Sequence, residues 1–178
     1  MCSSDLKGEK NGWDQQPKVQ LQVRHPERFE ERHENEWPLA RTQWTTWHLH
    51  GRTSQLLTAP AQSASTVAFE AMGDGASFMS PPFESTTEVT GPIAARLFVS
   101  SSTADADLFV IFRVYTPDLR EITFMGAIDP HTPIAQGWLR ASHRKLDAKL
   151  STDYRPYHTH DEKQPLKPGE IVQLDIEL

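Results

Sequence analysis

The fold is decided by residues 93–115, which read IAARLFVSSSTADADLFVIFRVY. Residues 93–100 and 108–115 are rich in β-branched and aromatic side chains, which favour strands. The polar residues 100–105 between them are typical of a turn, and Asp105 and Asp107 introduce the second run. The stretch therefore predicts two neighbouring β-strands joined by a short turn.

Similar runs occur on both sides of this stretch. Alternating or β-branched residues predict further strands at 19–23, 44–50, 67–72, 121–128 and 171–178. Gly, Pro and Asp mark turns at 73–75, 116–118 and 168–169, and residues 52–66 and 151–167 are predicted to be loops. Short strands separated by regular turn signals favour a sandwich or a barrel, so we expect an all-β fold.

One window has a helical pattern. Residues 137–146 place Leu139, Ser142, His143 and Leu146 on one face at helical spacing. We therefore expect one short helix among the strands and long loops.

The length of 178 residues corresponds to about one domain. Residues 1–12 are polar and unpatterned, which predicts a disordered tail, and we assign residues 13–178 to the domain. The last predicted strand alternates up to the final residue. We therefore expect a domain that is incomplete at its C-terminus.

Charge and cysteine content exclude several classes. The chain has 18 basic and 24 acidic residues, a net charge of −6, and no basic stripe, which argues against a nucleic-acid partner. The charged residues 28–36 are mixed in sign and are interpreted as a solvated face. No apolar run is long enough for a signal peptide or a membrane span. Because Cys2 is the only cysteine, we expect no disulfide and a cytoplasmic location.

No catalytic motif is complete. None of the nine glycines belongs to a G-x-S-x-G nucleophile motif, and no glycine-rich phosphate loop is present. We therefore assign no catalytic residue and expect this chain to be inactive alone.

Metal binding is the main chemical alternative. His48 and His50 lie two apart, as do His158 and His160, but the carboxylate that a jelly-roll oxygenase or cupin places a few residues later is missing in both cases. We interpret the first pair as surface residues and the second as hydrogen-bonded loop residues. We expect no metal and no cofactor, although a metal-dependent jelly-roll enzyme stays open as an alternative.

Five segments resemble one protein family in the same order along the chain. They are EWPLART at 36–42 with Trp44, EVTGP at 88–92, GAIDP at 126–130, GWLRASHR at 137–144 and PGE at 168–170. Together they resemble the C-terminal domain of the CocE/NonD hydrolases, which include cocaine esterases and X-Pro dipeptidyl-peptidases. The resemblance covers roughly residues 11–178.

This resemblance implies a jelly-roll, galactose-binding-like β-sandwich without catalytic residues. It also implies a parent serine hydrolase that cleaves esters or X-Pro peptide bonds, whose nucleophile lies in an N-terminal α/β-hydrolase domain. The domain would pack on that catalytic domain, wall the substrate cleft and take part in homodimer contacts. The family continues past the last strand seen here, so we expect the chain alone to be prone to aggregation.

We expect cleft or domain-interface contacts from Asp129 and His131 in one loop, and from Trp138, Arg140 and His143 in the next segment. The purely structural alternatives are that Trp138 belongs to the core and that His143 with Arg144 caps the short helix. A free-standing sandwich module that binds sugar or peptide is the second functional hypothesis.

Overall fold

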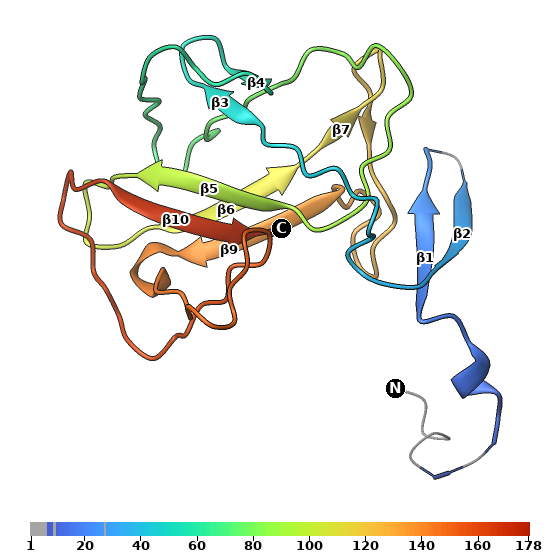
Figure 1. Ribbon diagram of the computed structural model, residues 1–178. Coiled ribbons are helices and arrows are strands. Elements are labelled where there is room, and N and C mark those ends of the chain that lie inside the picture. Colours follow the sequence, from blue (N-terminus) through green and yellow to red (C-terminus); the bar gives the residue numbers. More distant parts are fainter. Residues whose placement is uncertain (1–6, 9, 27) are drawn as a thin grey trace. The chain divides into compact units, whose positions relative to one another are not determined.

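The computed structural model describes residues 7–8, 10–26 and 28–178. These fall into two compact units (Figure 1). The larger unit combines the chain up to Ala40 with Thr90–Leu178, and the smaller unit is Arg41–Val89. Each unit is described by itself.

The larger unit is built around two antiparallel strand pairs. β5 (Ala94–Val99) pairs with β10 (Val172–Glu177), and β6 (Asp107–Phe112) pairs with β9 (Ala135–Arg140). Figure 1 shows the two pairs as stacked layers. Alternate residues of all four strands point inward, as the period of two requires. The prediction of an all-β sandwich from residues 93–115 is confirmed, while the jelly-roll strand order stays a prediction.

The core lies between these layers. Its buried members come from β9, β10 and the segments that follow or precede them, and they are Leu139, Ala141, Leu166, Leu174 and Ile176. Partly buried aliphatic residues of β5 and β6 pack against them. Leu174 and Ala141 are fully buried. This small core fixes the spacing of the two layers and leaves their outer faces open.

Short hairpins complete the two units. In the larger unit, β1 (Val19–Arg24) pairs with β2 (Phe29–Glu34), and β7 (Val114–Tyr115) pairs with β8 (Glu121–Ile122). In the smaller unit, β3 (His48–His50) pairs with β4 (Gln55–Leu57). The 3₁₀ helices η1 (Trp13–Gln15) and η2 (Ala141–His143) are the helical elements of the described residues.

The solvated face expected at the charged residues 28–36 agrees with the structure, where most side chains of β2 are exposed while its backbone pairs with β1. Other local predictions were wrong. β4 lies in the segment predicted to be a loop, where Gln55 also bridges to Met79. Residues 67–70 form no strand, and of residues 44–50 only the last three do.

The short helix expected within residues 137–146 is confirmed only over Ala141–His143, which form the 3₁₀ helix η2. Residues 137–140 belong instead to strand β9. Gly137 explains why this segment is extended and not helical. A Cβ atom at this position would overlap the carbonyl group of Glu177, so glycine permits β10 to approach β9 closely. Glycine is also a poor helix former.

The predicted tail, residues 1–12, is only partly covered: residues 1–6 and 9 lie outside the described residues. Gly12 has a left-handed conformation, with φ of 80°, immediately before η1. In the described part of the chain, no helix has the length and apolar character needed to cross a bilayer.

Candidate functional site

The outer face of the β6–β9 pair carries an exposed aromatic patch. Phe109 and Trp138 are directly opposite each other in the strand register, and they are 74% and 68% exposed. Ile111 lies two residues along the same face and is 45% exposed. Large apolar side chains in a contiguous exposed group are typical of an interaction surface. We call Phe109, Ile111 and Trp138 the aromatic face.

Trp138 is therefore not a core residue, and that alternative is wrong. Its neighbours Gly137 and Leu139 point into the sandwich, so the strand period places Trp138 outward. The core position beside it is taken by Leu139, which is 5% exposed.

Arg140 lies at the end of the aromatic face and pairs with Asp107 across the two strands. Its Nε and Nη2 atoms donate to the two carboxylate oxygens at 2.7 and 2.8 Å. This two-point hydrogen bond lowers the pKa of Asp107 and raises that of Arg140. Both side chains are about half exposed, so solvent screens the pair and it contributes little to the fold. It borders the aromatic face with a fixed pair of opposite charges.

Asp129 and His131 lie in the turn between β8 and β9. The Asp129 carboxylate accepts a hydrogen bond from the His131 backbone N–H at 2.8 Å, and the Asp129 carbonyl accepts one from Gly126 N at 2.8 Å. Asp129 therefore shapes this turn. The turn exposes Met125 (85%) and Ile128 (99%) to solvent. It presents an apolar tip rather than an acid–base pair.

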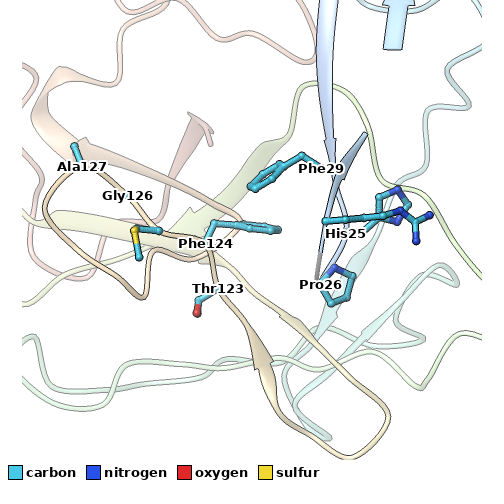
Figure 2. A pocket seen from close by; sticks show the side chains of 9 residues that line it. His25, Pro26, Phe29, Thr123, Phe124, Gly126 and Ala127 are labelled. Carbon is cyan, nitrogen blue, oxygen red and sulfur yellow. The ribbon is translucent and has the colours of Figure 1, made fainter. Parts of the chain in front are cut away.

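A pocket of about 570 Å³ lies beside this turn, between the β1–β2 connection and residues 123–127 (Figure 2). The Phe29 and Phe124 rings both line it, with centroids 6.2 Å apart and ring planes tilted by 44°. The guanidinium of Arg24 lies 4.9 Å from the centroid of the Phe124 ring, at the distance of a cation–π contact. These contacts attach the β1–β2 hairpin to the segment that precedes β9.

His143 does not belong to the aromatic face. It lies in η2, and its Nδ1 atom is 3.1 Å from Nδ1 of His160. The preceding residue, Ser142, is almost fully buried and donates through both N and Oγ to the Asp105 carboxylate, at 2.9 and 2.6 Å. Burial raises the pKa of Asp105, but the hydrogen bonds from Ser142 and Ala106 outweigh burial, and the net pKa is lowered. Asp105 thus anchors the end of β9 that carries His143.

Arg144 caps the end of this turn, as the alternative of helix capping predicted. Its Nη1 atom donates to the carbonyl of Ala141 at 3.1 Å and to the carbonyl of Gln164. The cap is supplied by Arg144, while His143 contacts another histidine.

The two H-x-H pairs differ in the structure. In β3, His50 Nε2 donates to the Ala59 carbonyl, 2.9 Å away. His158 is half-buried, and burial, followed by the neighbouring His160, lowers its pKa. Among the described residues, no group of three or more His, Cys, Asp or Glu side chains is arranged to hold a metal ion.

The structure thus divides the predicted residues into three places: Trp138 and Arg140 on one strand face, Asp129 and His131 in one turn, and His143 beside His160. Sequence reasoning missed Phe109 and the contact between His143 and His160. Phe109 lies in the continuous apolar run 108–112, where alternation gives no signal of which residues face outward. His160 is 17 residues from His143, so no local spacing links them.

Comparison with solved structures supports the fold. Two structures of a CocE/NonD family hydrolase from Staphylococcus aureus superpose with TM-scores of 0.86 and 0.87, at 30% and 29% sequence identity. Each match covers 97% of this chain but only 32% of the longer protein.

Two curated mycobacterial proteins, from Mycobacterium bovis and Mycobacterium tuberculosis, are provisionally named serine esterases. Each is 32% identical to this chain over 109 residues, which is 57% of this chain and 15% of the relative. The chain therefore spans about one third of the staphylococcal hydrolase and matches 15% of each mycobacterial relative.

Residues 11–178 match the family model of the X-Pro dipeptidyl-peptidase C-terminal non-catalytic domain. The match covers nearly the whole chain, agrees with the β-sandwich, and agrees with the resemblance of the five segments. The chain belongs to the family of X-Pro dipeptidyl-peptidase C-terminal non-catalytic domains.

Proposed function

We propose that this chain is the non-catalytic C-terminal domain of a CocE/NonD-type serine hydrolase that cleaves ester or X-Pro peptide bonds. In this proposal an α/β-hydrolase domain of the same parent chain supplies the nucleophile, and the sandwich packs on it. The names of the relatives and the small share of their length that this chain covers support it. With Cys2 as its only cysteine, the chain needs no oxidising compartment, which fits a cytoplasmic parent.

The aromatic face is the single observation that carries the packing proposal. Phe109 and Trp138 are more than two-thirds exposed although they form a cross-strand pair in a well-ordered sheet. Burying two such rings against a second domain contributes roughly 2 kcal/mol or more for each ring. Arg140 and Asp107, at the border of the face, would give the contact its orientation.

Asp129 and His131 would contribute to the cleft wall. Asp129 holds the turn that exposes Met125 and Ile128, and an apolar wall excludes water from an acyl-transfer site. Excluding water strengthens the interactions that stabilise the oxyanion. His143 remains a candidate contact at the end of β9.

The test uses the parent protein encoded by the reading frame that contains this chain. We expect a G-x-S-x-G segment upstream, and hydrolysis of p-nitrophenyl acetate or Ala-Pro-p-nitroanilide by the full-length protein. The isolated chain should show no labelling by a fluorophosphonate. A parent without that segment would contradict the proposal and favour a free-standing binding module. Labelling of the isolated chain would contradict it as well, because this chain would then contain a nucleophile of its own.

A matched pair of variants tests the packing. In the full-length parent, Phe109→Ser should weaken the association of the two domains and lower kcat/KM. Phe98→Ser should do neither, because Phe98 is equally exposed (69%) on the outer face of the opposite sheet. Equal effects of the two substitutions would contradict the assigned face. A stable dimer of the isolated chain that Phe109→Ser dissociates would instead assign the face to a homodimer.

A further inference from the structure

Two imidazoles converge where η2 meets the loop that follows residue 157. Nδ1 of His143 and Nδ1 of His160 are 3.1 Å apart, and their ring centroids are separated by 5.3 Å with an interplanar angle of 44°. We propose that His143 and His160 form a two-imidazole site for a borderline divalent transition-metal ion such as Zn²⁺. This site is independent of the proposed hydrolase function.

The distance suits coordination. With metal–nitrogen bonds of about 2.05 Å, two nitrogens 3.1 Å apart subtend an angle of about 98° at the metal, between the octahedral and tetrahedral values. Imidazole nitrogens are good ligands for Zn²⁺, Ni²⁺ and Cu²⁺. Because no third side chain of the described residues joins this pair as a metal ligand, water molecules would complete the coordination shell.

The backbone holds His160 over His143 from both sides. Thr159 N donates to the carbonyl of Lys145 at 3.1 Å, and Gln164 N donates to the carbonyl of Ser142 at 2.8 Å. Between these two hydrogen bonds His160 adopts a left-handed conformation, with φ of 52°. Such a conformation is unfavourable for a non-glycine residue. The loop thus keeps a strained histidine in the one place where its Nδ1 meets that of His143.

The base of the site is equally fixed. His143 follows Ser142, whose N and Oγ atoms are bound by Asp105. Two ligands held by separate anchored segments lose little conformational entropy when they bind a metal. The site remains open to ions from solution because His160 is exposed and His143 is only partly buried.

Neighbouring charges are balanced and do not create the site. Lys145 pairs with Asp161 at 3.0 Å and with Glu162 at 3.6 Å, and Arg144 donates to two backbone carbonyls. Affinity would therefore come from the coordinate bonds. Binding needs both Nδ1 atoms without protons, so each ring must carry its proton on Nε2. Without metal, one Nδ1–H donates to the other Nδ1.

The experiment is calorimetric titration of the full chain with Zn²⁺ at neutral pH, on a Cys2→Ser background that removes the only thiol. We expect one ion per chain and an affinity at least about tenfold weaker in His143→Ala. The matched control is His48→Ala with His50→Ala, which removes a histidine pair of β3 and should leave the affinity unchanged.

His160→Gly separates metal binding from folding. Glycine adopts a φ of 52° without strain, so this variant should fold with an unchanged or higher Tm and still lose Zn²⁺. With Cu²⁺, electron paramagnetic resonance should show two coupled nitrogens in the parent chain and fewer in His160→Gly. Absence of saturable binding, or equal affinity of the parent chain and His160→Gly, would overturn the proposal.

Discussion

The outer faces of the two sheets carry similar ion pairs but differ in their exposed aromatic residues. Each face carries a cross-strand ion pair, Arg96–Asp175 on β5–β10 and Arg140–Asp107 on β6–β9, both at 2.7 Å. On the first face Phe98 lies opposite Gln173, whereas on the second Phe109 lies opposite Trp138.

This difference indicates which of the two sheets contacts a partner. A single exposed aromatic residue beside a polar neighbour is ordinary for a protein surface. A cross-strand pair of exposed aromatic residues, extended by Ile111, is a patch that water solvates poorly. We therefore propose that the interdomain contact lies on β6–β9 and that the outer face of β5–β10 has no such partner.

The largest effects should be the same in both sheets. Leu174→Ala in β10 and Leu139→Ala in β9 each remove a buried core side chain, so each should lower the free energy of unfolding by about 2–5 kcal/mol. Urea denaturation of the isolated chain measures both. A loss confined to one variant would show that the two layers do not share one core.

A smaller loss of unfolding free energy is expected when the hydrogen bonds between Asp105 and the buried Ser142, next to the β6–β9 sheet, are removed. Asp105→Ala leaves the buried Ser142 N and Oγ without their acceptor, which should cost about 1–3 kcal/mol. Asp105→Asn, which keeps the shape, should cost less. Ser142→Ala in the same background should restore part of the loss; no restoration would contradict the assigned anchor.

The same carboxylate predicts a pH dependence. Since the folded pKa of Asp105 is lowered, its contribution to stability is present above the unfolded value of about 3.9. It is lost as pH falls through the lower folded pKa. The difference in Tm between the parent chain and Asp105→Asn should therefore shrink below about pH 4. A difference that grows as pH falls would contradict the direction of the shift.

Exposed aromatic residues should affect association more than stability. In the isolated chain Phe109→Ser should reduce light scattering on warming, and Phe98→Ser should reduce it less, because Phe98 is not part of a patch. Each change in unfolding free energy should be within about 1 kcal/mol. If only Phe98→Ser reduces light scattering, the surface that drives association lies on the β5–β10 sheet instead.

The smallest effects are expected for the two ion pairs. Asp107→Asn should lower Tm only slightly, and this effect should disappear in high salt, because both partners are about half exposed. Asp175→Asn should lower Tm somewhat more. Its carboxylate is 13% exposed and also accepts a hydrogen bond from Gln173 at 2.7 Å. Thermal melts at low and high salt distinguish the two.

Sequence patterns predicted the sandwich better than the site. The runs that became β1, β5, β6 and β10 were visible because branched and aromatic residues alternate or cluster between turns. β9 was mistaken for a helix because the reason for its extended form, the approach of β10 to Gly137, is a contact between residues 40 positions apart.

The candidate residues were found by resemblance to a family, and their roles depend on tertiary contacts. Trp138 and Arg140 needed the strand register to be placed on one face with Phe109. His143 could not be connected to His160 from spacing, since a loop returns the second histidine to the first. Asp129 and His131 were correctly predicted to share a loop, which the sequence shows directly.

Hydroxyl-radical footprinting of the full-length parent and of this chain alone tests the central claim most directly. Oxidation of Phe109, Trp138 and Phe98 would be compared by mass spectrometry in both proteins. We predict that Phe109 and Trp138 become protected in the parent while Phe98 stays reactive. Protection of Phe98 with unchanged reactivity of Trp138 and Phe109 would contradict the assignment of β6–β9 as the face that packs on the hydrolase domain.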